Sequence, residues 1–295
     1  MGGEGVVDGG GKEFERVSDE LRARMANGVY PLGTLLPPQR VLAQEFRVSR
    51  DTVRRVLRVL SNEGWIETRQ GSGSRVMKVQ RIHSLGSRTI RPAQAVTLRS
   101  FINDAFEAPE VTLDVYTLTS ESLDAHIRMQ AERIRDHEIS PQRIALRMLL
   151  PSEELKLPYP TTKGAPDDPR LQDRLHEITQ RHSASLKGAL RVLRTDRLVS
   201  TVDIEIRRVP IAPTFKLYLL NGSEALHGPY EVIERTIELD DAEEVVALDV
   251  LGLGATLTHY EKDDDPNATG TVFVGGMQAW FDSIWTRLAH REHRP

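Results

Sequence analysis

The segment Ser49-Arg50-Asp51-Thr52-Val53-Arg54-Arg55-Val56-Leu57 decides how the first part of this chain folds. Serine is a preferred N-cap residue, so Ser49 predicts the start of a helix. Apolar residues recur at helical spacing on one side of this helix while arginines occupy the other, the apolar set being Val53, Val56, Leu57 and Leu60. A helix with a cationic face and an apolar face that packs on the rest of the domain is suited to binding a polyanion.

The residues before this segment predict two further helices. One stripe at helical spacing consists of Phe14, Val17, Leu21 and Met25. Asn27-Gly28 ends that helix, and a proline-rich loop leads to a short second helix that buries Leu42, Ala43 and Phe46. Because only Arg47-Val48 separates the second helix from Ser49, the spacing predicts a helix-turn-helix.

The residues after this segment predict a β-hairpin. Two strand-like runs, Trp65–Arg69 and Ser74–Val79, flank the sequence Gln70-Gly71-Ser72-Gly73. The glycines allow the backbone at the tip to approach a neighbour closely. Helix, helix-turn-helix and hairpin, in this order, indicate a winged helix.

Double-stranded DNA is the polyanion that this arrangement fits best. The third helix matches the width of the major groove, so its arginines are expected at base edges or adjacent phosphates. Arg40 and Arg69 are placed for phosphates, and the hairpin tip for a minor groove. The alternative is that the arginines form only the solvated face of a surface helix. The residues expected at the DNA are Arg40, Ser49, Arg50, Thr52, Arg54, Arg55, Arg69, Gln70, Gly71 and Gly73.

Residues 13–78 resemble the GntR family of bacterial transcription factors. The runs that carry the resemblance are Leu36-Pro37-Pro38-Gln39-Arg40-Val41-Leu42-Ala43, Val48–Arg54, Leu60–Ile66 and the Gly71-Ser72-Gly73 turn. The chain departs from the family pattern at Pro38 and Gln39, where the family has serine and glutamate. The resemblance implies a transcription regulator that binds a short palindromic operator as a homodimer.

Composition limits the other classes of protein. The chain of 295 residues has no cysteine, which excludes disulfides, thiolate zinc sites and cysteine nucleophiles. No apolar run approaches the roughly eighteen residues that a membrane helix needs, so we expect no membrane partner and a cytoplasmic location. The net charge of −4 is unevenly distributed, with the first 78 residues basic and the remainder acidic. This asymmetry favours a front part that meets the polyanion.

Four segments are predicted along the chain. Residues 1–11 form a glycine-rich disordered leader, unlike a signal peptide, and residues 12–79 form the DNA-binding domain. Residues 80–100 carry several arginines but no acid, and are expected to be a linker that lies near DNA or is simply solvated. Residues 101–295 form an effector-sensing and dimerisation domain.

The last segment alternates between strand-like and helix-like runs. Strands are expected at 111–118, 144–150, 202–206, 215–220, 231–239 and 245–251, with helices at 120–136, 171–193 and 277–288. This order indicates an α/β domain with a mixed sheet. The fold class predicted for the whole chain is thus an α+β winged helix-turn-helix followed by an α/β domain.

The sequence contains no recognisable catalytic or metal-binding motif. A nucleophile elbow, a glycine-rich phosphate loop and a paired-histidine site are all missing from it. The acidic run Asp263-Asp264-Asp265 lacks the glycine and distal glutamate of an EF-hand loop. We therefore expect no metal, no cofactor and no enzyme activity.

Residues 214–229 are similar to the signature of the phospholipase D family, and the strand order of residues 100–290 also resembles one half of that fold. By this resemblance Lys216 is the retained phosphate-binding lysine, Thr214 replaces the nucleophilic histidine, Asn221 replaces an aspartate and Pro229 a serine. A threonine without an adjacent base cannot replace imidazole, so the resemblance implies a catalytically inactive site. It also implies pairing, because the family builds one site from two halves.

What remains is an expected effector site at Lys216, Asn221 and the nearby His227. The alternative is that residues 215–220 are a core strand whose lysine reaches outward to solvent. Three functions therefore stay open: a regulator with an inactive phospholipase D-like sensor, a regulator with a chorismate-lyase-like sensor, and a phosphodiester-processing enzyme with an appended DNA-binding head.

Overall fold

The computed structural model describes residues 9–26, 29–62, 65–69, 73–77, 82–84, 98–239, 243–250 and 256–291. The chain divides into two compact units, residues 1–79 with 236–244, and residues 80–235 with 245–295. The first helix begins at Gly9, within the segment predicted as a leader, and residues 1–8 lie outside the described residues.

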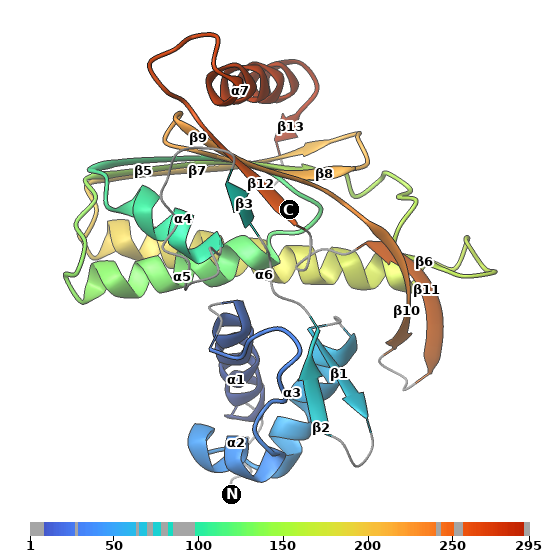
Figure 1. Ribbon diagram of the computed structural model, residues 1–295. Coiled ribbons are helices and arrows are strands. Elements are labelled where there is room, and N and C mark those ends of the chain that lie inside the picture. The colour runs from blue at the N-terminus through green and yellow to red at the C-terminus, as the bar shows by residue number, and fades with distance from the viewer. Residues whose placement is uncertain are drawn as a thin grey trace, which may run out of the picture. The chain divides into compact units, whose positions relative to one another are not determined.

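The described residues of the N-terminal part of the first unit form three helices and a two-stranded hairpin (Figure 1). Its elements are α1 (Gly9–Ala26), α2 (Gln39–Phe46), α3 (Arg50–Asn62), β1 (Ile66–Arg69) and β2 (Gly73–Val76). The apolar stripes of the three helices meet in one core, which includes Val17, Leu21, Met25, Leu42, Phe46, Val53, Val56, Leu57 and Leu60. The predicted winged helix-turn-helix is confirmed.

Backbone hydrogen bonds attach the wing to the loop that precedes α2. Strands β1 and β2 pair antiparallel in the register from Ile66 opposite Val76 to Arg69 opposite Gly73. The N–H of Gly33 donates to the carbonyl of Val76, and the N–H of Leu36 to that of Ser74, both at 2.8 Å. Strand β2 is therefore bonded along both edges, to β1 and to residues 33–36, so the wing does not project as an isolated hairpin.

An eight-stranded mixed sheet forms the centre of the second unit, so the mixed sheet predicted for this part is confirmed. The strand order is β13-β7-β5-β4-β8-β9-β12-β3. Strands β7, β5 and β4 run parallel, whereas β8, β9 and β12 pair antiparallel. The strands are β3 (Ile82–Ser84), β4 (Glu110–Tyr116), β5 (Arg143–Pro151), β7 (Thr201–Val209), β8 (Phe215–Leu220), β9 (Glu224–Pro229), β12 (Leu257–Glu261) and β13 (His290–Arg291).

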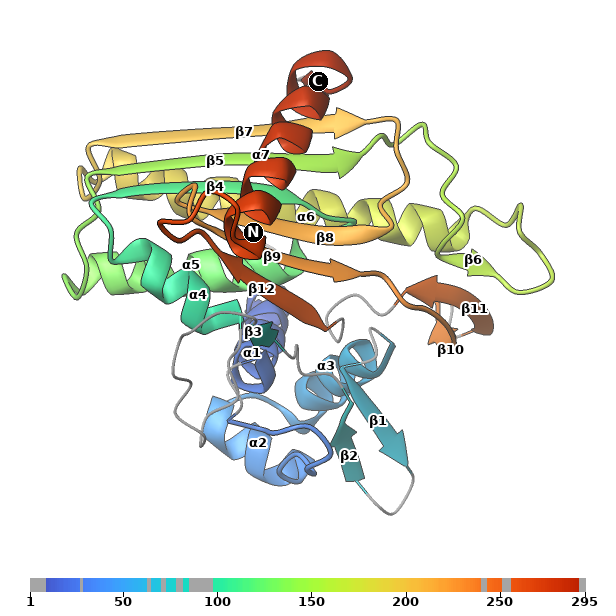
Figure 2. The same cartoon turned by 45° about the horizontal axis from the view of Figure 1, so that its top comes forward.

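Helices cover both faces of this sheet (Figures 1 and 2). The crossovers from β4 to β5 and from β5 to β7 place α5 (Glu121–Arg135) and α6 (Arg170–Thr195) on one face, beside α4 (Leu98–Phe106). Helix α7 (Thr269–Arg287) lies on the opposite face. A smaller sheet has the order β10-β11-β6, formed by β10 (Val232–Glu238), β11 (Glu244–Val250) and β6 (Thr161–Thr162).

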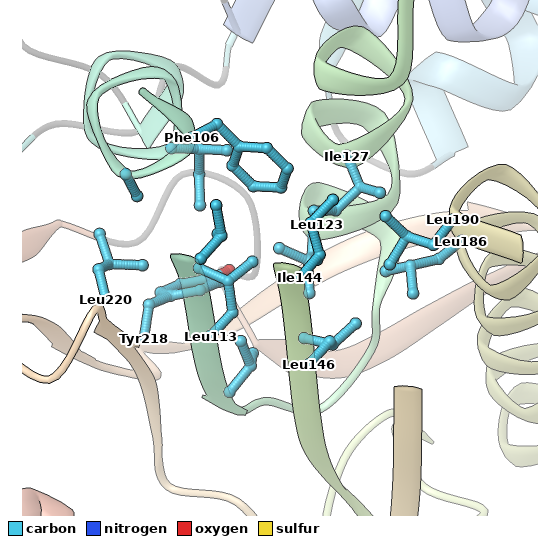
Figure 3. Packing of buried hydrophobic residues seen from close by; sticks show 14 of the residues in the cluster. Phe106, Leu113, Leu123, Ile127, Ile144, Leu146, Leu186, Leu190, Tyr218 and Leu220 are labelled. Carbon is cyan, nitrogen blue, oxygen red and sulfur yellow. The ribbon is translucent and has the colours of Figure 1, made fainter. Parts of the chain in front are cut away.

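The main core of the second unit fills the space between the sheet and the helices α4, α5 and α6. Leu113 of β4 and Ile144 and Leu146 of β5 project toward this helical layer (Figure 3). They pack among side chains of the helices, including Phe106, Leu123, Ile127, Leu186 and Leu190. Burying each such side chain contributes about 1.5–3 kcal/mol of hydrophobic free energy.

Arg147 helps to fix α7 on the other face. Its guanidinium lies 5.1 Å from the ring centroid of Phe281 and 5.4 Å from that of Trp285. The same group pairs with Asp114 of β4 and, at 2.8 Å, with Asp282 of α7. One strand, its neighbour and the helix are thereby joined through a single cation.

The described parts of the predicted linker, residues 80–100, belong to the second unit. Strand β3 pairs parallel with β12, from Ile82 opposite Leu257 to Ser84 opposite His259. Helix α4 begins at Leu98, which is buried. The remaining linker positions lie outside the described residues.

Candidate DNA-binding surface

Helix α3 presents its arginines to solvent and its apolar residues to the core. Arg50, Arg54 and Arg58 are exposed and follow one another at intervals of four residues, which places them on one face. Thirteen residues give α3 a length of about 20 Å. The side chains of these three arginines point away from the interior, as the predicted DNA-reading role of Arg50 and Arg54 requires.

Ser49 caps α3, as its position in the sequence predicts. The N–H of Thr52 donates to Ser49 Oγ at 3.0 Å, and the two hydroxyls lie 2.9 Å apart. The Thr52 side chain is buried, so its hydroxyl contributes to the cap. The geometry therefore gives Ser49 and Thr52 a structural role in placing α3, and a contact of either with DNA stays a prediction.

The turn between α2 and α3 depends on a left-handed residue. Arg47 has φ 56° and ψ 45°, and the N–H of Val48 donates to the carbonyl of Ala43 at 3.0 Å. This local bond ends α2 and redirects the chain toward Ser49. At the other end of α2 the side chain of Pro38 makes no capping hydrogen bond, which is the consequence of the departure from the family pattern.

The other predicted DNA-contacting arginines differ in their surroundings. Arg40 and Arg50 are exposed and make no hydrogen bond or ion pair with the described part of the chain. Arg54 pairs with Asp51 on the surface, and the Arg55 guanidinium lies 5.3 Å from the ring centroid of Phe14. An exposed ion pair contributes at most about 1 kcal/mol, so Arg54 can exchange Asp51 for a phosphate at little cost.

Arginines of α1 hold the domain together instead of joining this surface. Arg16 donates to the carbonyl of Phe46 at 2.7 Å. Arg24 pairs with Glu45 and with Glu20, and its guanidinium lies 4.9 Å from the ring centroid of Phe46. These bonds to Glu45 and Glu20 raise the pKa of Arg24 even against the desolvation that lowers it. Not every cation of the basic front part is thus available to DNA.

The tip of the wing is described only in part. Arg69 ends β1 opposite Gly73, whose φ of 84° is in the left-handed region that glycine tolerates. Gln70 and Gly71 lie outside the described residues. Sequence reasoning overlooked Arg47, at the turn, and Arg58, which continues the four-residue spacing of Arg50 and Arg54.

The structure does not bring together the three residues expected to bind an effector. Lys216 shares the face of Tyr218, toward α5 and α6, whereas His227 pairs opposite Leu217 on the α7 face. His227 lies between Phe215 and Phe273, and burial lowers its pKa. Asn221 lies in the turn after β8, five residues from Lys216 along the chain.

Asn221 and Lys216 each have surroundings that differ from the prediction. The Asn221 amide accepts the N–H of Thr112 at 2.8 Å and donates to the carbonyl of Ala105 at 3.0 Å, so it fastens a turn. Lys216 is only 4% exposed, which contradicts the alternative of a lysine reaching outward to solvent. Its ammonium lies 5.6 Å from the ring centroid of Tyr230.

The described residues include no helix that is long and apolar enough to span a membrane. Nor do they contain a group of three or more His, Asp or Glu side chains arranged to hold a metal ion.

Comparison with known proteins identifies the first unit. Residues 14–76 match the family described as "Bacterial regulatory proteins, gntR family". The Exu regulon transcriptional regulator of Escherichia coli (strain K12) is 39% identical over 70 residues, or 24% of this chain and 27% of that protein. An uncharacterized HTH-type transcriptional regulator of Rhizobium meliloti (strain 1021) is 34% identical over 83 residues, 28% of this chain and 34% of that protein.

The solved structure of mutant ORR3 in complex with the NTD of AraR is 28% identical and covers 22% of this chain and 91% of that one. Its TM-score of 0.21 supports no conclusion about the fold. The chain spans about a quarter to a third of the length of the curated relatives named above. The phospholipase D-like resemblance of the second unit has no support from these comparisons. The N-terminal domain, residues 14–76, is a winged helix-turn-helix domain of the GntR family.

Proposed function

We propose that the chain is a DNA-binding transcriptional regulator of the GntR type, located in the cytoplasm with the DNA that it binds. The observation that carries this proposal is the exposed arginine row of α3, on a helix whose start is fixed by the Ser49 cap. The family match of residues 14–76 supports it independently.

In this proposal α3 enters the major groove, which is about 12 Å wide and admits one helix. Arg50, at the first position of α3, is placed to read a base edge, since an arginine fork can bond a guanine at two atoms. Arg40 and Arg47 lie on the α2 side of the turn and contact phosphates, which fixes the register but reads no sequence.

We propose that the protein acts as a homodimer on a palindromic operator. One chain carries one winged helix, and a two-fold dimer presents two such heads to half-sites about one helical turn apart. The curated relatives are named as transcriptional regulators, which agrees with a role in transcription regulation.

We assign the second unit to sensing and dimerisation, with no enzymatic role. The phosphodiester-processing alternative depended on Lys216 and His227 acting together. These side chains lie on opposite faces of the sheet, so no common substrate can contact both.

Selection of a preferred site from random duplexes, followed by fluorescence anisotropy at several salt concentrations, tests the function. For about six phosphate contacts, log K should fall with log salt at a slope of about −5. Arg50→Ala should lose about 1–3 kcal/mol of discrimination for one base pair. Arg40→Ala should instead weaken all sequences similarly and reduce the salt slope by about one.

Arg287, exposed on α7 of the second unit, provides the matched control, because Arg287→Ala removes the same charge outside the DNA-binding domain. Its affinity and slope should equal those of the wild type. Absence of any preferred site, or an affinity that does not respond to salt, would refute the proposal.

A further inference from the structure

Buried polar side chains gather where β4 ends and α5 begins. Strand β4 ends at Tyr116, the loop Thr117–Ser120 follows, and α5 starts at Glu121. Around this junction Ser120, Asp124, His182, Ser183 and Lys216 are each at most 5% exposed. Ligands of α/β proteins commonly bind outside the carboxyl ends of the strands, where this junction lies.

Lys216 lies beside this loop. Strand β8 pairs antiparallel with β4, Tyr116 lying opposite Leu217, so Lys216 meets the first loop residue, Thr117. The Tyr230 hydroxyl accepts the N–H of Leu118 at 2.8 Å and lies 3.1 Å from Thr117 Oγ1. Because Nζ of Lys216 is 5.6 Å from the ring centroid of Tyr230, a buried lysine side chain adjoins the entry to α5.

The start of α5 offers hydrogen-bond donors. Ser120 occupies the N-cap position, but its side chain does not cap the helix. Its Oγ lies instead 3.1 Å from Ser183 Oγ on α6. Two hydroxyls that bond each other use one proton, which leaves the second for another acceptor. The first-turn N–H groups and the helix dipole add positive potential, which the first-turn carboxylates of Glu121 and the buried Asp124 partly offset.

His182 supplies an observation independent of the helix end. Its Nδ1 lies 2.9 Å from Asp124 Oδ2, which fixes the imidazole between α5 and α6. Its Nε2 is buried and has no hydrogen-bond partner among the described residues. A buried polar atom without a partner costs about 1–3 kcal/mol, so a group not belonging to the described chain is expected to bond it.

We propose that the junction, named here the α5 N-terminal site (Ser120, His182, Ser183 and Lys216), binds the oxyanion of a small hydroxyl-bearing molecule. The helix end, the spare hydroxyl proton and the ammonium attract the carboxylate or phosphate group. His182 Nε2 bonds a hydroxyl of the same molecule. Of the effector residues predicted from sequence, only Lys216 belongs to this site.

This inference deepens the sensor role, and rests on the proposed function only for the consequence that the anion alters DNA binding. The closing experiment therefore measures the anion without DNA. Titration calorimetry of the full chain uses glycerate, glycerol 3-phosphate and glycerol, then glucuronate, glucose 6-phosphate and glucose, with inorganic phosphate as the bare anion. Comparison within each set separates carboxylate from phosphate and both from the neutral polyol.

At least one charged polyol should bind saturably at one site per chain, more tightly than inorganic phosphate, while the neutral polyols should not bind. Ser183→Ala should weaken that anion about tenfold, the equivalent of one charge-assisted hydrogen bond. Lys216→Met should weaken it further, and Ser183→Ala keeps the test valid if Lys216→Met does not fold. Ser185→Ala, the same change two residues along α6, should bind as the wild type does.

Three outcomes would overturn the site: no saturable anion in either set, equal binding of a neutral polyol, or Ser183→Ala within twofold of the wild type. Operator binding by the wild type and Ser183→Ala without added anion is measured in parallel. If the operator binds and the anions do not, the site is wrong and the proposed function stands. If the anion binds and no operator can be selected, the site stands and the proposed function is wrong.

Discussion

Replacement of Ser49 separates the structural role of this residue from its proposed position near DNA. Ser49→Ala removes the acceptor of the Thr52 N–H, at 3.0 Å, and the partner of the Thr52 hydroxyl. Loss of a serine N-cap costs about 0.5–2 kcal/mol, typically about 1. Because Thr52 is buried, its hydroxyl has little access to water as a replacement, which places the expected loss near the upper half of that range.

Ser49→Asp is the informative companion. Aspartate caps helices as well as serine does, and its charge favours the positive end of α3, so stability should stay within about 0.5 kcal/mol of the wild type. The same carboxylate would face the phosphates. One added charge about 6 Å from a phosphate costs about 0.7 kcal/mol in water and about 2.8 at an effective dielectric constant of 20. Operator affinity should therefore fall roughly three- to a hundredfold.

Two measurements on the full chain distinguish these effects. Hydrogen exchange of the α3 amides reports the local opening free energy of the helix, and fluorescence anisotropy reports operator affinity. Ser49→Ala should lower the first and Ser49→Asp mainly the second. If Ser49→Asp destabilised α3 as much as Ser49→Ala, or bound the operator with unchanged affinity, the assignment of the cap and of its place near DNA would be wrong.

Four further substitutions test other parts of the fold by urea denaturation. Arg47→Gly keeps the left-handed conformation of the turn and removes its steric cost, which is about 1–2 kcal/mol for a non-glycine residue. After the greater entropy of glycine in the unfolded chain is subtracted, a gain in stability of up to about 1 kcal/mol is expected. Any loss of stability would argue against strain at the turn. Gly228→Ala would place a methyl group 2.6 Å from Leu257 Cδ2 and still closer to the carbonyl oxygen of Thr256, and this overpacking should lower the free energy of unfolding by about 1–3 kcal/mol. The control is Gly188→Ala, at an exposed helical position with open space around it, which should stabilise the protein by about 0.5–1 kcal/mol. Burial, aided by the charge of Arg99, lowers the pKa of His126 to about 4. Because the unfolded chain binds this proton near pH 6.5 and the folded chain does not, the free energy of unfolding should fall as the pH drops from 7 toward 4, by about 2 kcal/mol at pH 5. His126→Gln should show a correspondingly smaller difference in stability between pH 7 and pH 5.

The elements of the first unit could be predicted because each depends on a local signal. Ser49 forms a cap with a residue three positions away, and the stripe from Val53 to Leu60 needs only helical periodicity. The turn at Gly73 requires a residue in the left-handed conformation, and a glycine in the sequence predicts such a turn. None of these signals depends on a distant part of the chain.

Elements of the second unit that were missed have signals that conflict or fall near a boundary. Strand β9 ends in Gly228-Pro229, a pair that indicates a turn. Its glycine is there because the backbone of Thr256 passes too closely for a side chain. Helix α4 carries an apolar helical stripe, Leu98, Phe101, Ile102 and Ala105, but it begins within residues 80–100, the predicted linker.

The candidate effector site shows why spacing along a strand misleads. Lys216 and Asn221 belong to one motif, yet five residues of extended chain cover about 17 Å, too far for one small molecule to contact both. His227 is close to Lys216 in the hairpin, but the register of β8 and β9 turns it to the other face. The side chains that we propose to accompany Lys216 come from the junction of α5 and α6. Ser120 and Ser183 meet across 63 positions of sequence, and Asp124 and His182 across 58. Such pairs follow from the packing of two helices on one face of a sheet, so a single sequence without an alignment cannot reveal them. The motif around Lys216 therefore shares one residue with the proposed site and predicts different companions for it.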